Sequence, residues 1–144
     1  MKERDNETVP NDITQPARPD ALPVLVEFVR AHARTIGCKD ERTREIGVAV
    51  EEALQNIVQF ACADGSGEIT IACNIHDMGA LLIDITDTGI PFNMLVATSF
   101  PETADFIGPG PKPSTNKLKK ALGNIEYRRD AYNKRNILAC VVWK

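Results

Sequence analysis

Apolar residues recur at intervals of three and four positions in two stretches of the first half of the chain. The first stretch follows Asp20, a suitable N-cap, tolerates Pro23 in its opening turn and stops at Gly37. The second begins at Asp40 and is broken by the polar run from Asp64 to Gly67. The repeated positions are Leu22, Leu25, Val29, Ala33, Ile36, Ile46, Val50, Ala53, Ile57 and Ala61. This spacing predicts two amphipathic helices, each with one buried face.

Strict alternation replaces the helical spacing after Gly67. Ile69 to Ile75 alternates apolar with polar residues, which predicts a half-buried strand. After a turn from His76 to Gly79, Ala80 to Thr86 returns as a second strand and leads to Asp87. The side chains expected to face the core are Ile69, Ile71, Cys73, Ile75, Ile83 and Ile85.

The segment between Asn93 and Thr115 carries four prolines and two glycines and shows no periodicity. Long connections of this kind are usually functional or mobile, so we expect a mobile lid from Met94 to Lys112. A short helix follows, capped by Ser114 or Thr115.

The last elements form a predicted hairpin, Ile125 to Arg129 and Ile137 to Trp143, with Trp143 in the core or at a homodimer contact. Together the elements predict an α/β fold, a two-layer sandwich in which helices cover one face of a mostly antiparallel, mixed sheet. One domain, residues 18–144, accounts for this pattern. Residues 1–17 are expected to be a flexible leader or an edge strand.

Composition restricts the compartment. The chain is 43% hydrophobic, has no apolar run long enough to span a bilayer, and begins with a polar, acidic stretch instead of a secretory signal. These features predict a cytoplasmic protein without a membrane partner. The cysteines lack Cys-x-x-Cys spacing and are expected to be small buried hydrophobes; they are Cys38, Cys62, Cys73 and Cys140. His32 and His76 are expected at the surface and not in a metal site.

The net charge of −3 is divided unevenly along the chain. Residues 112–144 carry nine Lys/Arg and two Asp/Glu, a balance of +7, so residues 1–111 carry −10. This division would suit an anionic ligand at the basic end or an acidic partner, although a solvated helix and turn is the simpler interpretation. The basic part is too mixed, and too poor in interleaved aromatics, for nucleic-acid binding.

Two polar side chains lie four residues apart in the second predicted helix. Glu52 and Asn56 therefore share one face of an otherwise largely apolar stretch, where they need hydrogen-bond partners or a cavity. A pairing of Glu52 with Arg42 or Arg44 is the simpler structural alternative. We expect Glu52 and Asn56 to face a cavity opposite Asp87. Taken alone, Asp87 before Gly89 and Pro91 is typical of an ordinary Asx-type turn.

The runs Glu52-Ala53-Leu54-Gln55-Asn56, Phe60-Ala61 and Asp87-Thr88-Gly89-Ile90-Pro91-Phe92 resemble the ATP-binding module of gyrase, sensor histidine kinases and mismatch-repair ATPases. The chain is most similar to the small anti-sigma-factor serine/threonine kinases of bacteria. The resemblance extends from about Pro16 to the C-terminus.

This resemblance implies ATP and Mg²⁺ as cofactors. It implies that Glu52 is the catalytic general base that orients the attacking hydroxyl or water, and that Asn56 binds nucleotide through Mg²⁺. It implies that Asp87 accepts a hydrogen bond from the adenine amino group and that Gly89 lets the backbone approach the ring. Phe92 belongs to the same nucleotide-binding motif. We expect nucleotide binding to depend on Asp87 more than on Lys112.

The phosphate-binding turn departs from the family pattern. The family has Gly-x-Gly before a helix, whereas Lys112-Pro113-Ser114 occupies those positions here, with Gly108 and Gly110 nearby. Lys112, Ser114 and Thr115 can still attract phosphate by charge and by backbone N–H groups. Phe60 replaces a frequent histidine, and an Asn-Lys-Arg-Asn turn replaces glycines before the last strand.

Three hypotheses follow. The first is a kinase that binds a sigma factor and phosphorylates its anti-sigma-factor antagonist. The second is a nucleotide-free pseudo-kinase that acts by partner binding alone. The third, from the run Leu82 to Gly89 with its Asp-Thr-Gly, is an aspartic protease, which needs an all-β body and a second aspartate from a dimer. Because the helix motif is retained and the phosphate turn is altered, we expect partner binding with a low or absent kinase rate.

Overall fold

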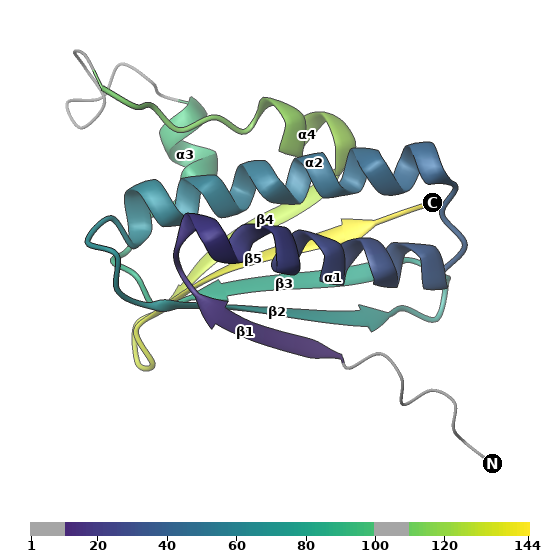
Figure 1. Ribbon diagram of the computed structural model, residues 1–144, viewed down its shortest axis with the longest axis horizontal. Helices are drawn as coiled ribbons and strands as arrows, with labels where there is room; N and C mark the ends of the chain where they lie inside the picture. The colour runs from purple at the N-terminus through teal and green to yellow at the C-terminus, as the bar shows by residue number, and fades with distance from the viewer. Residues whose placement is uncertain (1–10, 100–109) are drawn as a thin grey trace.

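The computed structural model describes residues 11–99 and 110–144 (Figure 1). The elements in chain order are β1 (Asp12–Pro16), a 3-10 turn (Pro19–Ala21), α1 (Leu22–Thr35), α2 (Asp40–Asn56) with a π-helical turn (Ile57–Ala61), β2 (Glu68–Ile75), β3 (Leu81–Asp87), α3 (Met94–Ser99), α4 (Asn116–Ala121), β4 (Asn124–Asp130) and β5 (Arg135–Val142).

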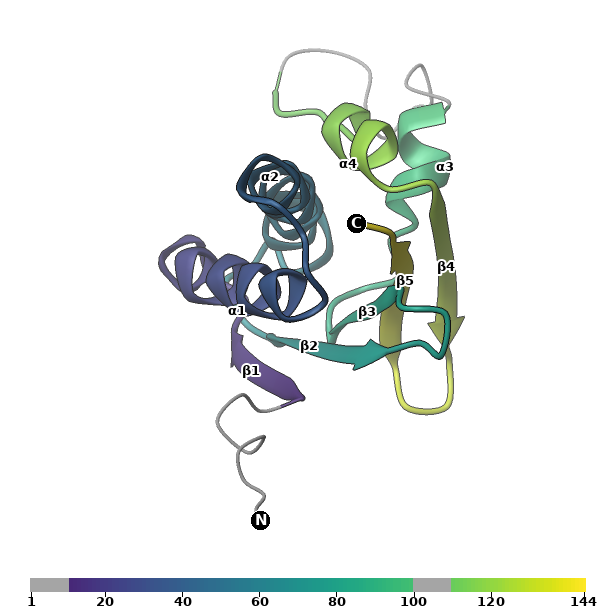
Figure 2. The ribbon, with the colours of Figure 1, turned by 90° about the vertical axis from the view of Figure 1, so that its right-hand side faces the viewer.

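The five strands form one sheet in the order β1-β2-β3-β5-β4, and every neighbouring pair is antiparallel. Figure 2 shows the sheet bending around α1 and α2, which cover one of its faces. The predicted two-layer sandwich is therefore confirmed. Among the described strands no parallel pair occurs, so the predicted mixed character of the sheet is wrong there. β1 lies at one edge of this sheet.

The first helix begins differently from the prediction. Asp20 lies inside the 3-10 turn, Ala21 holds the N-cap position of α1, and no side chain caps that helix. Pro19 favours the backbone conformation of the 3-10 turn, and Asp20 is part of that turn instead of capping α1. Gly37 does end the helix, with φ +95° and its N–H donated to the Arg34 carbonyl at 3.0 Å.

The core lies between the helices and the sheet. Nine of the ten stripe positions and all predicted inward strand residues except Ile75 are buried; Ile36, the tenth stripe residue, is half-buried. Ile75 is 58% exposed because the β1–β2 register ends at Ala72, which leaves the end of β2 without a described neighbour on that side. Trp143 follows β5 and is 51% exposed, so the core assignment was wrong, whereas the homodimer contact stays a prediction.

Two further expectations need correction. His32 is buried, not at the surface, with its ring against Phe28 and Nδ1 3.0 Å from the Phe28 carbonyl. The predicted lid begins with a packed helix, α3, because the Asn93 side chain accepts the N–H groups of Leu95 and Val96 and Met94 is buried. Residues 100–109, including Gly108, lie outside the described part of the chain.

Helix α4 is held at both ends by α2. The expected caps, Ser114 and Thr115, make no side-chain cap bond. Instead, Glu52 Oε1 accepts the Leu118 N–H at 2.8 Å, and Arg42 Nη1 donates to the Ala121 carbonyl at 2.9 Å. A carboxylate at the N-terminus and a guanidinium at the C-terminus both oppose the partial charges of a helix.

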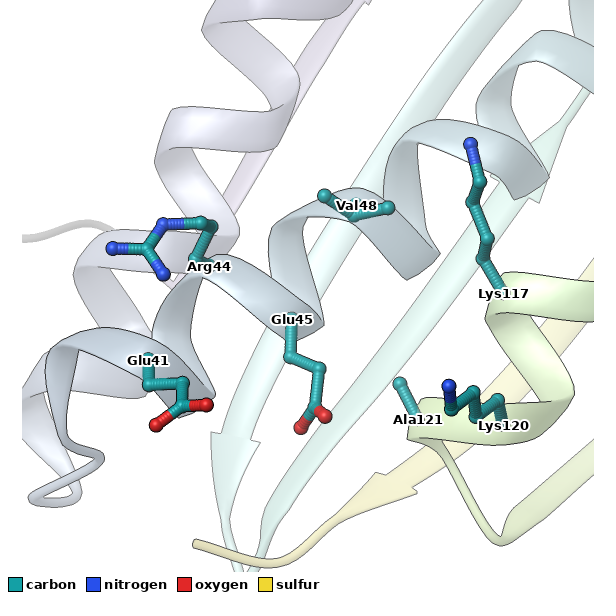
Figure 3. A pocket seen from close by; sticks show the side chains of 7 residues that line it. All are labelled: Glu41, Arg44, Glu45, Val48, Lys117, Lys120 and Ala121. Carbon is teal, nitrogen blue, oxygen red and sulfur yellow. The ribbon is translucent and has the colours of Figure 1, made fainter.

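Charges of opposite sign face each other along the outer side of these helices. Figure 3 shows Glu41 and Glu45 on α2 and Lys117 and Lys120 on α4 around a surface hollow of about 310 Å³. Their attraction adds to the two end contacts of α4, to an extent limited by solvent screening. Within residues 11–99 and 110–144, no helix combines the length and apolarity needed to cross a bilayer.

Candidate functional site

Glu52 and Asn56 occupy the last two turns of α2 and are buried at 8% and 3% exposure. Both contact Ser114, which lies just before α4. The Ser114 hydroxyl donates to Glu52 Oε2 at 2.8 Å, and Asn56 Nδ2 donates to the Ser114 carbonyl at 2.8 Å. Ser114 N–H in turn donates to Asn56 Oδ1 at 3.3 Å. The shared helix face predicted from sequence therefore contacts Ser114, in the turn before α4.

The alternative pairing of Glu52 with an arginine is wrong. Arg42 instead bonds Glu45 at 2.8 Å, the Ala121 carbonyl and the Trp143 carbonyl. With Leu118 N–H on Oε1 and the Ser114 hydroxyl on Oε2, both oxygens of Glu52 accept hydrogen bonds. Its burial is thus compensated within the domain, as a buried carboxylate requires.

A second polar contact joins α3 to α4. Thr98 Oγ1 lies 2.7 Å from Thr115 Oγ1 and accepts Lys119 Nζ at 3.3 Å. Asn56 Nδ2 also lies 3.5 Å from Met94 Sδ at the start of α3. Asn56, Ser114 and Thr115 are therefore brought together, whereas Gly110 and Lys112 lie exposed before them.

Asp87 ends β3 and is 3% exposed. Its Oδ1 accepts Gly89 N–H at 2.9 Å and Asn136 Nδ2 at 2.8 Å. The first bond is the Asx-type turn that the sequence suggested. Within the described residues no hydrogen bond to Oδ2 is found, so this oxygen is the one that could accept a ligand N–H.

Asn136 at the start of β5 organises the surroundings of Asp87. Its Nδ2 also donates to the Ile90 carbonyl at 2.7 Å, and its Oδ1 accepts Tyr127 OH at 2.6 Å, Arg129 Nη1 at 3.2 Å and Phe92 N–H at 3.3 Å. The sequence analysis placed Asn136 in a turn and missed this role. A polar residue directly before the alternating run that starts at Ile137 was the available signal.

Gly89 lies against the π-helical turn that ends α2. A Cβ at this position would collide with the Ala61 carbonyl, which accepts Ile90 N–H at 2.9 Å. The glycine is therefore required by close backbone packing as well as by any ligand. Phe92 stacks on Phe60, with ring centroids 5.4 Å apart, across the same junction. A π turn in this place is typical of functional sites.

The four cysteines are buried and free, as predicted from their spacing. Burial raises the pKa of Cys62 to about 11 and that of Cys73 to about 12. These thiols stay protonated at neutral pH and pack as small hydrophobes. In the described part of the chain, no three His, Cys, Asp or Glu side chains gather as metal ligands.

The pH dependence of stability should report the burial of Asp87. Burial raises the pKa of this carboxyl, against the hydrogen bonds from Asn136 and Gly89 that lower it. The folded protein therefore holds the proton more tightly than the unfolded chain. The stability contributed by this group is fully present below the ordinary aspartate pKa of about 3.9 and is lost as pH rises through the folded pKa.

We expect Asp87→Asn to keep the Oδ1 contacts while removing this titration. Urea denaturation between about pH 4 and pH 7 should show a smaller loss of stability with rising pH in the variant than in the parent protein. Equal pH slopes in the two proteins would contradict the assignment of a raised pKa.

Comparisons with known proteins concern the family and the fold. The model of the histidine kinase-like ATPase domain family matches residues 15–119. No curated protein matches the chain. Among solved structures, the RsbU and RsbW domains of Rv1364c from Mycobacterium tuberculosis share the fold, with 13% identity and a TM-score of 0.59 over 91% of this chain and 32% of that one.

The histidine kinase domain of the blue-light activated kinase EL346 from Erythrobacter litoralis is also similar. It is 18% identical, with a TM-score of 0.51 over 88% of this chain and 60% of that one. The present chain thus spans less than two thirds of either protein, and these likenesses concern the fold. With the family model matched over most of its length, the chain belongs to the histidine kinase-like ATPase domain family.

Proposed function

We propose that this protein is an anti-sigma-factor-like regulator that binds a transcription-regulatory protein in the cytoplasm and transfers phosphoryl groups slowly or not at all. The observation that carries the proposal is the occupation of Glu52 and Asn56 by Ser114. The family membership and the RsbW-containing neighbour support the regulatory part.

The adenine half of a nucleotide site fits the residues present. Asp87 is held by two donors on Oδ1, so Oδ2 has a fixed direction for an adenine amino group, and Gly89 keeps that side of the turn free of a side chain. ATP would supply the phosphoryl group for transfer. These contacts support nucleotide binding through Asp87 more than through Lys112, which is an exposed lysine.

The phosphate half does not fit without rearrangement. Glu52 can act as a general base only after it releases the Ser114 hydroxyl and the Leu118 N–H, and Asn56 can reach Mg²⁺ only after it releases Ser114. Hydrogen bonds to charged groups are each worth about 1.5–3 kcal/mol. In-line transfer is also sensitive to placement, since an error of about 1 Å can cost about a hundredfold in rate. Partner binding has neither requirement.

A sigma factor or an anti-sigma-factor antagonist is the proposed class of partner. The second candidate function is the nucleotide-free pseudo-kinase, favoured by the same internal pairing of Asn56. The aspartic-protease hypothesis is wrong, because the layer formed by α1 and α2 is incompatible with the all-β body that it requires.

The proposal is tested with purified protein, labelled ATP, Mg²⁺ and candidate sigma factors and antagonists. We expect a stable complex by size-exclusion chromatography and phosphoryl transfer near background. Glu52→Gln is the matched variant, because it keeps an acceptor for the Leu118 N–H, and it should leave complex formation unchanged. Rapid transfer that is lost in Glu52→Gln would restore a full kinase, whereas no complex with any candidate would contradict the regulatory role. Calorimetric titration with ATP separates the pseudo-kinase from a nucleotide-binding form.

A further inference from the structure

A polar cavity of about 440 Å³ lies between α1 and α2, in a part of the molecule that the proposed function does not use. Arg30 and Arg34 of α1 line it, together with Asp40, Thr43 and Arg44 of α2. The two α1 arginines are one helical turn apart and therefore share a face. Three guanidinium groups and one carboxylate give the cavity a formal charge of +2.

Gly47 determines where Arg30 lies. A Cβ at position 47 would collide with Arg30 Nε, and its three nearest neighbours would all be atoms of that guanidinium group. The half-buried arginine thus crosses the surface of α2 at its single glycine. A glycine inside a helix costs about 1 kcal/mol relative to alanine. Here it admits a cation into the groove.

The donors around this cavity are short of acceptors. Within residues 11–99 and 110–144, the guanidinium groups of Arg30 and Arg44 form no hydrogen bond and no ion pair. Thr43 is 3% exposed, and its Oγ1 is the one buried side-chain polar atom of the described chain without a hydrogen-bond partner. Arg34 bonds Glu27 at 2.9 Å, but both side chains are more than half exposed, and such a pair is weak.

Figure 3 shows the Arg44 side chain turned away from Lys117 and Lys120 of the neighbouring hollow. Arg44 lines both hollows, the one that it shares with Glu41 and Glu45 and the one that it shares with the α1 arginines. The buried Thr43 hydroxyl and the half-buried Arg30 guanidinium are groups that are normally paired, so their place in one cavity indicates a missing acceptor, which the exposed Arg34 and Arg44 could also reach.

We propose that this cavity binds a phosphoryl group, held by Arg30, Arg44 and Arg34 with Thr43 beside them. Planar guanidinium groups donate in pairs to phosphate oxygens, which a lysine cannot do. A phosphoryl group carries about −1.5 to −2 charges at neutral pH and three acceptor oxygens, so it offers several guanidinium groups an acceptor at once. The group could come from free phosphate or from a phosphorylated serine, which have the same chemistry.

The test is calorimetric titration of the full chain with inorganic phosphate and, separately, with phosphoserine, at constant ionic strength set by chloride. We expect saturable binding that Arg30→Gln weakens by at least about tenfold, since one charged hydrogen-bonding partner is lost. Gly47→Ala should weaken binding similarly by displacing Arg30, while its thermal midpoint stays level or rises because alanine favours the helix. Arg128→Gln, an exposed arginine of β4, is the control and should bind as the parent does.

Three outcomes overturn the proposal. They are no saturable binding of either ligand, equal affinities in the parent and Arg30→Gln, and a loss of binding in Lys112→Gln alone, which would place the anion at the turn before α4. Binding that needs Arg30 and Gly47 supports it with either ligand. Tighter binding of phosphoserine than of phosphate then identifies a phosphorylated protein as the source of the group.

Discussion

Replacing Asn136 by alanine is expected to lower the free energy of unfolding by about 4 kcal/mol, the range for breaking a buried polar network that contains a charge. The carboxamide holds Asp87 Oδ1 and the Ile90 carbonyl and accepts from Tyr127. Its removal leaves the buried carboxylate with one donor, the Gly89 N–H, and takes away the side-chain donor to the Ile90 carbonyl. The effect exceeds what the lost volume alone would produce.

Urea denaturation followed by circular dichroism measures this change. Asn124→Ala is the matched control, because Asn124 begins β4 at an exposed position, and it should change stability by no more than about 0.5 kcal/mol. A loss below about 1 kcal/mol for Asn136→Ala would show that the network contributes little.

The second large effect is expected at Glu52, independently of catalysis. Glu52→Ala should destabilise the protein by about 3 kcal/mol, because Leu118 N–H loses a charged acceptor in a buried place and the Ser114 hydroxyl loses another. Glu51→Ala, one residue earlier and exposed, is the control and should be close to neutral.

Amide hydrogen exchange locates the Glu52 effect. The Leu118 amide should exchange much faster in Glu52→Ala, while the amides of β2 change only as global stability does. A uniform change across α4 and β2, with the same free energy for both glutamate variants, would argue against Glu52 as the residue that holds α4.

The sequence predicted those elements that depend on local pattern. The two stripes placed α1 and α2, and alternation placed β2 and β3, because burial of one face dictates these periods. The α4 contacts were not predictable in this way, because Glu52 and Leu118 are 66 positions apart and no local pattern near Leu118 indicates which group accepts its N–H. Asp20 is a residue type that often caps helices, but here it lies in a 3-10 turn and does not cap α1.

The candidate site divides along the same line. Glu52, Asn56 and Asp87 were found because their motifs are short and continuous. Asn136 was missed because its role arises only when β5 pairs with β3 and brings it opposite Asp87. The contacts of Ser114 with α2 also depend on the tertiary structure. They show that Glu52 accepts a hydrogen bond from the Ser114 hydroxyl and is not a free base.

The double attachment of α4 to α2 constrains how this chain can change during evolution. Arg42 and Glu52 are ten residues apart, about 15 Å along the helix, and each holds one end of α4. Point substitutions between Arg42 and Glu52 leave the separation of these two residues unchanged. An insertion or deletion of a single residue there would rotate Arg42 by about 100° around the helix axis relative to Glu52. Only one end of α4 could then remain attached. Length variation among descendants should therefore avoid this stretch of α2.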